Sequence, residues 1–118
     1  MLLAIDCGNT QTVIGLFSDR EIIDHWRIAT AAERTSDELA LMFQQFLGFH
    51  GFSFDAHVSG VVIASGVPRV TAALREMTER YFGYEALVLE PLADLVPWLK
   101  IPGDGTVHDA LAGLQSEP

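Results

Sequence analysis

The hydrophobic pattern of the first thirty residues predicts three strands joined by short turns. Residues 2–5 and 11–17 are mainly apolar, and residues 21–29 have apolar positions that include Ile22, Ile23, Trp26 and Ile28. A polar turn after residue 5 and Asp19-Arg20 separate these three segments. Runs rich in β-branched and aromatic residues, bounded by Gly, Asn and Asp, are typical of strands and hairpin turns. Three strands connected this closely predict an antiparallel meander.

The pattern then changes to the spacing of a helix over about residues 36–49. Thr35 or Ser36 is a suitable N-cap, and Asp37 and Glu38 are favourable in a first helical turn. Apolar side chains recur every three or four residues, at Leu39, Met42, Phe43, Phe46 and Leu47. This stripe predicts packing in the core or at a subunit interface.

A second alternation of strand and helix follows. Residues 58–64 form a nearly continuous apolar run, as in buried parallel strands, and Pro68 suits the first turn of a helix that ends near Phe82, with Gly83 as its stop. Residues 86–89 predict a fifth strand. The whole pattern predicts an α/β fold: a mixed five-stranded sheet with helices packed on it.

The domain organisation follows from where this pattern stops. We expect residues 1–91 to form one half-domain and residues 92–118 to form a divergent, irregular tail, because the tail holds three of the five prolines and no clear strand. A chain of 118 residues with 49% hydrophobic residues suffices for one modest core.

Charge and cysteine content narrow the possible partners. The formal net charge of −9 disfavours nucleic acid and anionic membranes as partners. Asp6 interrupts the N-terminal apolar run, so we expect no signal peptide, and no run reaches the length of a membrane span. The single cysteine, Cys7, forms no internal disulfide, which favours the cytoplasm. The four histidines lack the spacing of zinc ligands.

Candidate chemistry is concentrated in the first turn, Asp6-Cys7-Gly8-Asn9-Thr10. Gly8 has no Cβ, so a ligand can approach the backbone closely, and Asn9 and Thr10 add short polar side chains beside the turn amides. Asp6 would face the cation that accompanies a phosphate. Taken alone, such a segment is more often an ordinary turn, because Asp, Gly and Asn are the residues that turns prefer.

The surrounding segments change this assessment. The turn leads into Gln11-Thr12-Val13, and the chain continues with Trp26-Arg27, then Arg34-Thr35-Ser36-Asp37-Glu38-Leu39, then Ile63-Ala64-Ser65-Gly66-Val67-Pro68. In this order they resemble the type III pantothenate kinase family of the actin-like and sugar-kinase ATPase superfamily. The resemblance covers about residues 1–91 and implies a ribonuclease H-like (actin-like ATPase) half-domain.

The resemblance also implies a function. Members of the family use ATP to phosphorylate pantothenate at the first step of coenzyme A biosynthesis, with Mg²⁺ and a monovalent cation (K⁺ or NH₄⁺), as cytoplasmic homodimers. Asp6 would face the metal ion. The residues implied in binding the nucleotide are Asp6, Cys7, Gly8, Asn9, Thr10, Gln11, Thr12 and Val13.

The sequence departs from the family beyond the fifth strand. The family's Asp-Asn-Pro and Gly-Ala-Asp-Arg segments, which carry the general base, do not occur here. Asp109 falls near the expected place, but its neighbours do not match, so no base is assigned. The second half-domain is also missing. We therefore expect the N-terminal half of such a kinase, as a truncated or frame-shifted product would be, with little or no turnover.

Two other functions and two local interpretations stay open. A non-catalytic regulatory or interaction protein of the same family would keep the fold without the base. A ribonuclease H-like nuclease would use Asp6 and Glu38, but Ser65 stands where a third acid would help. Ser65-Gly66 is either beside the nucleotide or an ordinary strand-to-helix turn. Trp26 is interpreted as a core anchor with the stem of Arg27 packed beside it.

Overall fold

The computed structural model describes residues 1–89. Its elements follow one another in the order that the hydrophobic pattern predicts, with one short helix added. The elements are β1 (Leu2–Cys7), β2 (Gln11–Ser18), β3 (Glu21–Ala29), α1 (Ser36–Gly48), α2 (Phe54–His57), β4 (Gly60–Ser65), α3 (Pro68–Met77), η1 (Thr78–Phe82) and β5 (Leu87–Val88).

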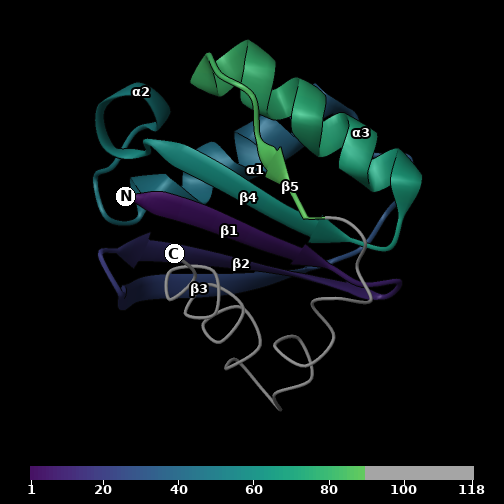
Figure 1. Cartoon of the computed structure of the whole chain (residues 1–118), viewed down its shortest axis with the longest axis horizontal. Helices are drawn as coiled ribbons and strands as arrows, with labels where there is room; N and C mark the ends of the chain where they lie inside the picture. The colour runs from purple at the N-terminus through teal and green to yellow at the C-terminus, as the bar shows by residue number, and fades with distance from the viewer. Residues whose placement is uncertain (90–118) are drawn as a thin grey trace.

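The strands form one mixed sheet in the order β3-β2-β1-β4-β5 (Figure 1). The first three strands pair antiparallel, β4 pairs parallel to the central strand β1, and β5 pairs parallel to β4. The chain passes through α1 between β3 and β4, and through α3 between β4 and β5. This arrangement confirms the predicted α/β fold, with its meander and its mixed five-stranded sheet.

The main core lies between the sheet and the two long helices, which cover the same face (Figure 1). Because successive side chains of a strand point to opposite faces, β1 sends Leu3, Ile5 and Cys7 toward the helices. Leu2 and Ala4 point to the other face, where they form a smaller cluster with Phe17 and Val13. The helices thus cover one face of the sheet, and Asp6 lies on the opposite face, together with Leu2 and Ala4.

Helix α1 begins where its cap residues predict. The Thr35 hydroxyl accepts a hydrogen bond from the Glu38 amide at 3.2 Å, and the Glu38 carboxylate accepts one from the Thr35 amide at 3.1 Å. This reciprocal capping box satisfies two amides that the helix leaves unpaired. Leu39, Phe43 and Leu47 are buried in the main core, which confirms the predicted apolar stripe.

Helix α3 begins at the predicted Pro68 but ends at Met77, and only together with η1 does the helical segment reach the predicted Phe82. Pro68 occupies its first turn, where a missing N–H costs nothing, and the helix continues into one π-helical turn, η1. Gly83 ends this turn with φ 88°, a left-handed conformation that glycine adopts without strain. The prediction of Gly83 as the stop is confirmed.

Several local predictions were wrong. Strand β1 extends through Asp6 and Cys7, which pair with Val13 and Thr12, so the turn itself holds only residues 8–10. The fourth strand begins and ends later than predicted, and the fifth contains only Leu87 and Val88. The short helix α2 was not predicted, because four residues are too few to establish a helical period.

Trp26 and Arg27 have different environments in the structure. The Trp26 ring stacks on Phe46 of α1, with centroids 5.0 Å apart and 8° between the planes, which confirms it as a core anchor. Arg27 does not pack beside it. Arg27 is exposed and its Nη1 lies 3.5 Å from Gln11 Oε1, because neighbours along a strand point to opposite faces.

The remaining sequence predictions concern the tail and membrane spans. Asp109 and the rest of the predicted tail lie outside the described residues. Within residues 1–89, no helix has both the length and the apolar character needed to cross a membrane.

Candidate functional site

Three strands, β1, β4 and β3, end at the same end of the sheet. The parallel strands β1 and β4 end side by side at Cys7 and Ser65, and β3 ends at Ala29 opposite Gln11. The β1–β2 turn, residues 8–10, therefore lies between the ends of β4 and β3. Ligands of open α/β sheets bind at such carboxyl ends, where backbone groups at strand ends are left without ladder partners.

Asp6 lies just before this turn, on the sheet face that the helices do not cover. Its side chain is half-buried, and burial raises the pKa of the carboxyl above its ordinary value. Within residues 1–89, no group donates a hydrogen bond to this carboxyl. A half-buried carboxylate without a donor is a suitable first ligand for a cation.

The turn exposes backbone donors beside Asp6. The Gly8 amide donates to the Gln11 carbonyl at 2.9 Å and closes the turn, and a Cβ on Gly8 would lie only 3.3 Å from that oxygen. Asn9 and Thr10 are exposed, and their amides donate to no acceptor in the part of the chain that the structure describes. Two N–H groups at an exposed turn, without an acceptor among residues 1–89, are suitable donors for an anion.

Thr30, the first residue after β3, holds the turn from the side. Its amide donates to the Thr10 carbonyl at 2.9 Å and its hydroxyl donates to the Gly8 carbonyl at 2.8 Å. The Thr30 hydroxyl also lies 2.8 Å from the Thr12 hydroxyl. Thr30 was not predicted from the sequence, because a threonine at the end of a strand carries no signal of its own.

The eight residues predicted to bind the nucleotide do not share one face. Cys7 and Thr12 are buried on the helix-covered side, where the Thr12 hydroxyl lies 3.4 Å from the Cys7 sulfur. Val13 is half-buried on the same face as Asp6, and Gln11 is exposed and accepts from Arg27. Asp6 and the turn residues can thus present side chains to a ligand, whereas Cys7 and Thr12 can offer only backbone groups.

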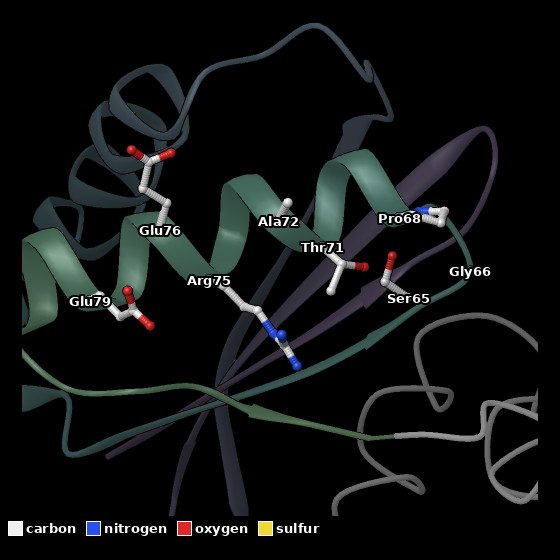
Figure 2. A pocket seen from close by; sticks show the side chains of 8 residues that line it. All are labelled: Ser65, Gly66, Pro68, Thr71, Ala72, Arg75, Glu76 and Glu79. Carbon is white, nitrogen blue, oxygen red and sulfur yellow. The ribbon is translucent and has the colours of Figure 1, made fainter.

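A pocket of about 510 Å³ lies along α3, from the β4–α3 connection at Ser65 and Gly66 to Glu79 (Figure 2). The Ser65 hydroxyl donates to the Val67 carbonyl and accepts from the Val67 amide, so it is committed to its own turn. Figure 2 shows Arg75 reaching from α3 toward β5, with Glu79 beside it. With Glu76 also lining the pocket, carboxylates outnumber the guanidinium, which disfavours a phosphate. These contacts favour the ordinary-turn interpretation of Ser65-Gly66.

The described residues offer little support for a two-metal site. Residues 1–89 contain no group of three His, Cys, Asp or Glu side chains placed to hold a metal ion. Glu38, the second acid of the nuclease alternative, is engaged in the capping box of α1. A cation at Asp6 would therefore take its other ligands from water and phosphate oxygens, as Mg²⁺ does in nucleotide sites.

Comparison with known proteins adds an independent observation. The family model described as type III pantothenate kinase matches residues 2–98. A protein named type III pantothenate kinase from Streptomyces griseus is 48% identical over 95 residues, which cover 77% of this chain and 36% of that protein. One from Myxococcus xanthus is 43% identical over 91 residues, covering 77% of this chain and 35% of that protein.

The match covers only part of the length of each relative. It spans little more than a third of the length of the curated relatives it matches. Among solved structures, the Aquifex aeolicus PPX-GPPA enzyme matches with a TM-score of 0.41 and 16% identity, over 75% of this chain and 35% of that one.

Proposed function

This chain belongs to the type III pantothenate kinase family, and from that premise we propose that its β1–β2 turn binds the phosphates of ATP together with Mg²⁺. The observation that carries the proposal is that the amides of Asn9 and Thr10, beside the half-buried Asp6, donate to no acceptor among residues 1–89. Exposed turn amides can donate to a phosphate, and a carboxylate that has no donor among residues 1–89 can bind the cation.

Each residue has a distinct part in this proposal. The Asn9 and Thr10 amides bind phosphate oxygens, and Gly8 lets the phosphate approach the backbone because it has no Cβ. Asp6 holds the cation, and a cation beside it favours the ionised carboxylate against the effect of burial. When bound, Mg²⁺ would offset charge on the transferred phosphoryl group.

For the whole protein, we propose the phosphorylation of pantothenate by ATP, the first step of coenzyme A biosynthesis. The finer properties of the family belong to the same proposal: a homodimer, a monovalent cation (K⁺ or NH₄⁺) and a cytoplasmic location. We also keep the proposed division into a half-domain over residues 1–91 and a divergent tail over residues 92–118.

The chain by itself should bind nucleotide without turning it over. The sequence lacks the Asp-Asn-Pro and Gly-Ala-Asp-Arg segments of the family, and the chain spans 36% of a relative such as the Streptomyces griseus protein. Phosphoryl transfer needs a positioned acceptor hydroxyl and a carboxylate near it, in a cleft that excludes water. One half-site supplies the phosphate cradle alone.

A nucleotide titration followed residue by residue tests the site. We expect ATP with Mg²⁺ to shift the amide resonances of Gly8, Asn9 and Thr10, with weak affinity, and to leave those of Thr71 and Arg75 in the other pocket unchanged. AMP with Mg²⁺ is the matched control, because it lacks the β- and γ-phosphates. Shifts confined to the Arg75 pocket, or none at the turn, would refute the proposed site.

A turnover assay tests the missing half. With ATP, Mg²⁺, K⁺ and pantothenate, we expect no phosphopantothenate above background from the chain alone. Robust product formation would show that the requirement for a second lobe is wrong.

The alternative is a non-catalytic regulatory or interaction protein of the same family. Exposed apolar side chains at Leu41, Phe49 and Leu87 favour it, because they suit contacts with another chain. Native mass spectrometry over a concentration series distinguishes the two: a monomer at all concentrations that binds ATP with Mg²⁺ would count against the alternative.

A further inference from the structure

We propose that Thr30 is a positioning residue for the nucleotide turn, acting through the two carbonyls that it holds rather than by touching the nucleotide. The inference rests on the proposed function, because the turn that Thr30 positions is the proposed phosphate site. Three contacts carry it: to the carbonyls of Gly8 and Thr10, and to the hydroxyl of Thr12.

The direction of each hydrogen bond follows from counting protons. A carbonyl oxygen only accepts, so the single proton of the Thr30 hydroxyl goes to the Gly8 carbonyl at 2.8 Å. The Thr12 hydroxyl can give its own proton either to the Thr30 oxygen at 2.8 Å or to the Cys7 sulfur at 3.4 Å. Sulfur is the weaker acceptor, so we assign this proton to Thr30. The result is a relay from the buried Thr12 through Thr30 to the backbone of the turn, in which each bond polarises the next.

The planarity of the peptide bond means that this relay orients the Asn9 amide, one of the two amides proposed to bind phosphate. In a trans peptide unit, the N–H points away from the carbonyl of the preceding residue. Because the Gly8 carbonyl points at Thr30, the Asn9 amide must point away from Thr30. The Thr10 carbonyl is fixed by the Thr30 amide in the same way, so the Gln11 amide also points away from Thr30.

Thr30 thus acts on the turn at two points, Gly8 and Thr10, with the exposed Asn9 between them. Without its hydroxyl, the Gly8–Asn9 peptide unit would be free to rotate, because the Gly8 carbonyl has no other strong donor among residues 1–89: the Cys7 sulfur lies 3.7 Å away and is a weak one. The Asn9 amide would then lose its fixed direction. Holding donors in place before the ligand arrives is what gives such a site its affinity.

The test compares three variants of the full chain. Thr30→Val removes the hydroxyl with little change in shape, and Thr30→Ser keeps it. Thr78→Val is the control: it removes a buried threonine hydroxyl that donates to Leu74 at 2.8 Å, far along the chain from the turn. Urea unfolding establishes a temperature at which all variants are folded, and the titration with ATP and Mg²⁺ is done there.

We expect Thr30→Val to weaken ATP binding about five- to tenfold, as the loss of one hydrogen bond would, and Thr30→Ser to stay within about twofold of wild type. In the free protein, amide ¹⁵N relaxation should show a less ordered Asn9 in Thr30→Val only. Thr78→Val should be less stable than wild type but bind ATP equally well, which separates positioning from stability.

The outcomes for the inference and for the proposed function are distinct. If wild type and Thr30→Val bind ATP equally, the positioning role is wrong and the proposed function stands. If wild type binds no ATP, the proposed function is wrong, and Thr30 is judged by relaxation alone: equal order at Asn9 in both proteins overturns the inference.

Discussion

Asp6, the proposed cation ligand, opposes stability at the scale of a single side chain. Its carboxyl is half-buried, has no hydrogen-bond donor among residues 1–89, and has a pKa raised by burial. The folded protein therefore holds the Asp6 proton more tightly than the unfolded chain does, and ionised Asp6 costs folding free energy. This cost is fully present above the folded-state pKa and disappears as pH falls through that pKa toward 3.8.

Replacing Asp6 separates the two effects. We expect Asp6→Asn to raise the melting temperature at pH 7, with a difference from wild type that shrinks toward pH 4, and to weaken binding of ATP with Mg²⁺ by tenfold or more, about the effect of losing a charged ligand. Differential scanning fluorimetry across pH and the ATP titration measure these changes.

Glu79→Gln is the control for Asp6→Asn, because it removes an exposed carboxylate of the same charge. If Asp6→Asn has a lower melting temperature than wild type at pH 7, the ionised Asp6 carboxylate stabilises the fold and the explanation by burial is wrong.

At this scale, the sequence pointed to several residues of the candidate site, whose role stays a prediction. Asp6, Gly8, Asn9 and Thr10 were identified because their residue types mark a turn and a cation ligand. The position of the turn was wrong by two residues, because the apolar pattern ends at Ile5 while backbone pairing continues through Cys7. Thr30 escaped notice because its role depends on a contact made across 22 residues, which no local pattern encodes.

At the scale of elements, the ends of the helices account for much of the local order. Thr35 caps α1 with its side chain, whereas Ser53, at the same position before α2, makes no such bond. The two residues provide a matched pair for measuring what the cap contributes.

We expect Thr35→Ala to lower the free energy of unfolding by about 1 kcal/mol, the usual value of an N-cap. Ser53→Ala should lower it by clearly less, because its hydroxyl bonds to Asp55 and not to a helix amide. Urea unfolding measures both, and equal losses would show that the capping box is not the cause.

Two glycines test the conformation at a helix end. Gly83 has φ 88°, where a Cβ is strained, so Gly83→Ala should cost about 1–2 kcal/mol. Gly48 ends α1 without a positive φ, and a Cβ there would meet nothing within 4 Å. Gly48→Ala should therefore be neutral or stabilise by up to about 1 kcal/mol. The comparison is made by urea unfolding, and a loss at Gly48 as large as at Gly83 would contradict this explanation.

The elements were predictable to different degrees for physical reasons. The meander, α1 and α3 carry strong periodicity and clear caps, and all three were predicted. The helix α2 and the exact length of β5 depend on packing, as in the stacking of Phe54 on Phe82 at 4.3 Å, which has no periodic signature in four residues.

At the scale of the whole molecule, one core joins the sheet to both long helices. Among residues 1–89, its main cluster contains buried residues from β1, β2, β4, α1 and α3. The helices cover one sheet face, so the turn at the sheet edge is supported by a core that the proposed half-domain supplies itself.

A chain that ends at residue 91 should therefore unfold cooperatively in urea, with an m-value in proportion to its length. A chain that ends at residue 82 is the negative control, because it also loses Gly83 and β5. If the 91-residue chain does not unfold cooperatively, the proposed domain boundary is wrong.

The burial of Cys7 provides a built-in reporter of the sheet edge. It is the chain's sole cysteine, and its sulfur is buried on the helix-covered face just before the turn, beside Thr12. An alkylating reagent can reach that sulfur only when β1 and its neighbours separate locally, so the modification rate counts these openings. ATP with Mg²⁺, by holding the turn closed, should slow the reaction, and no label needs to be introduced to observe it.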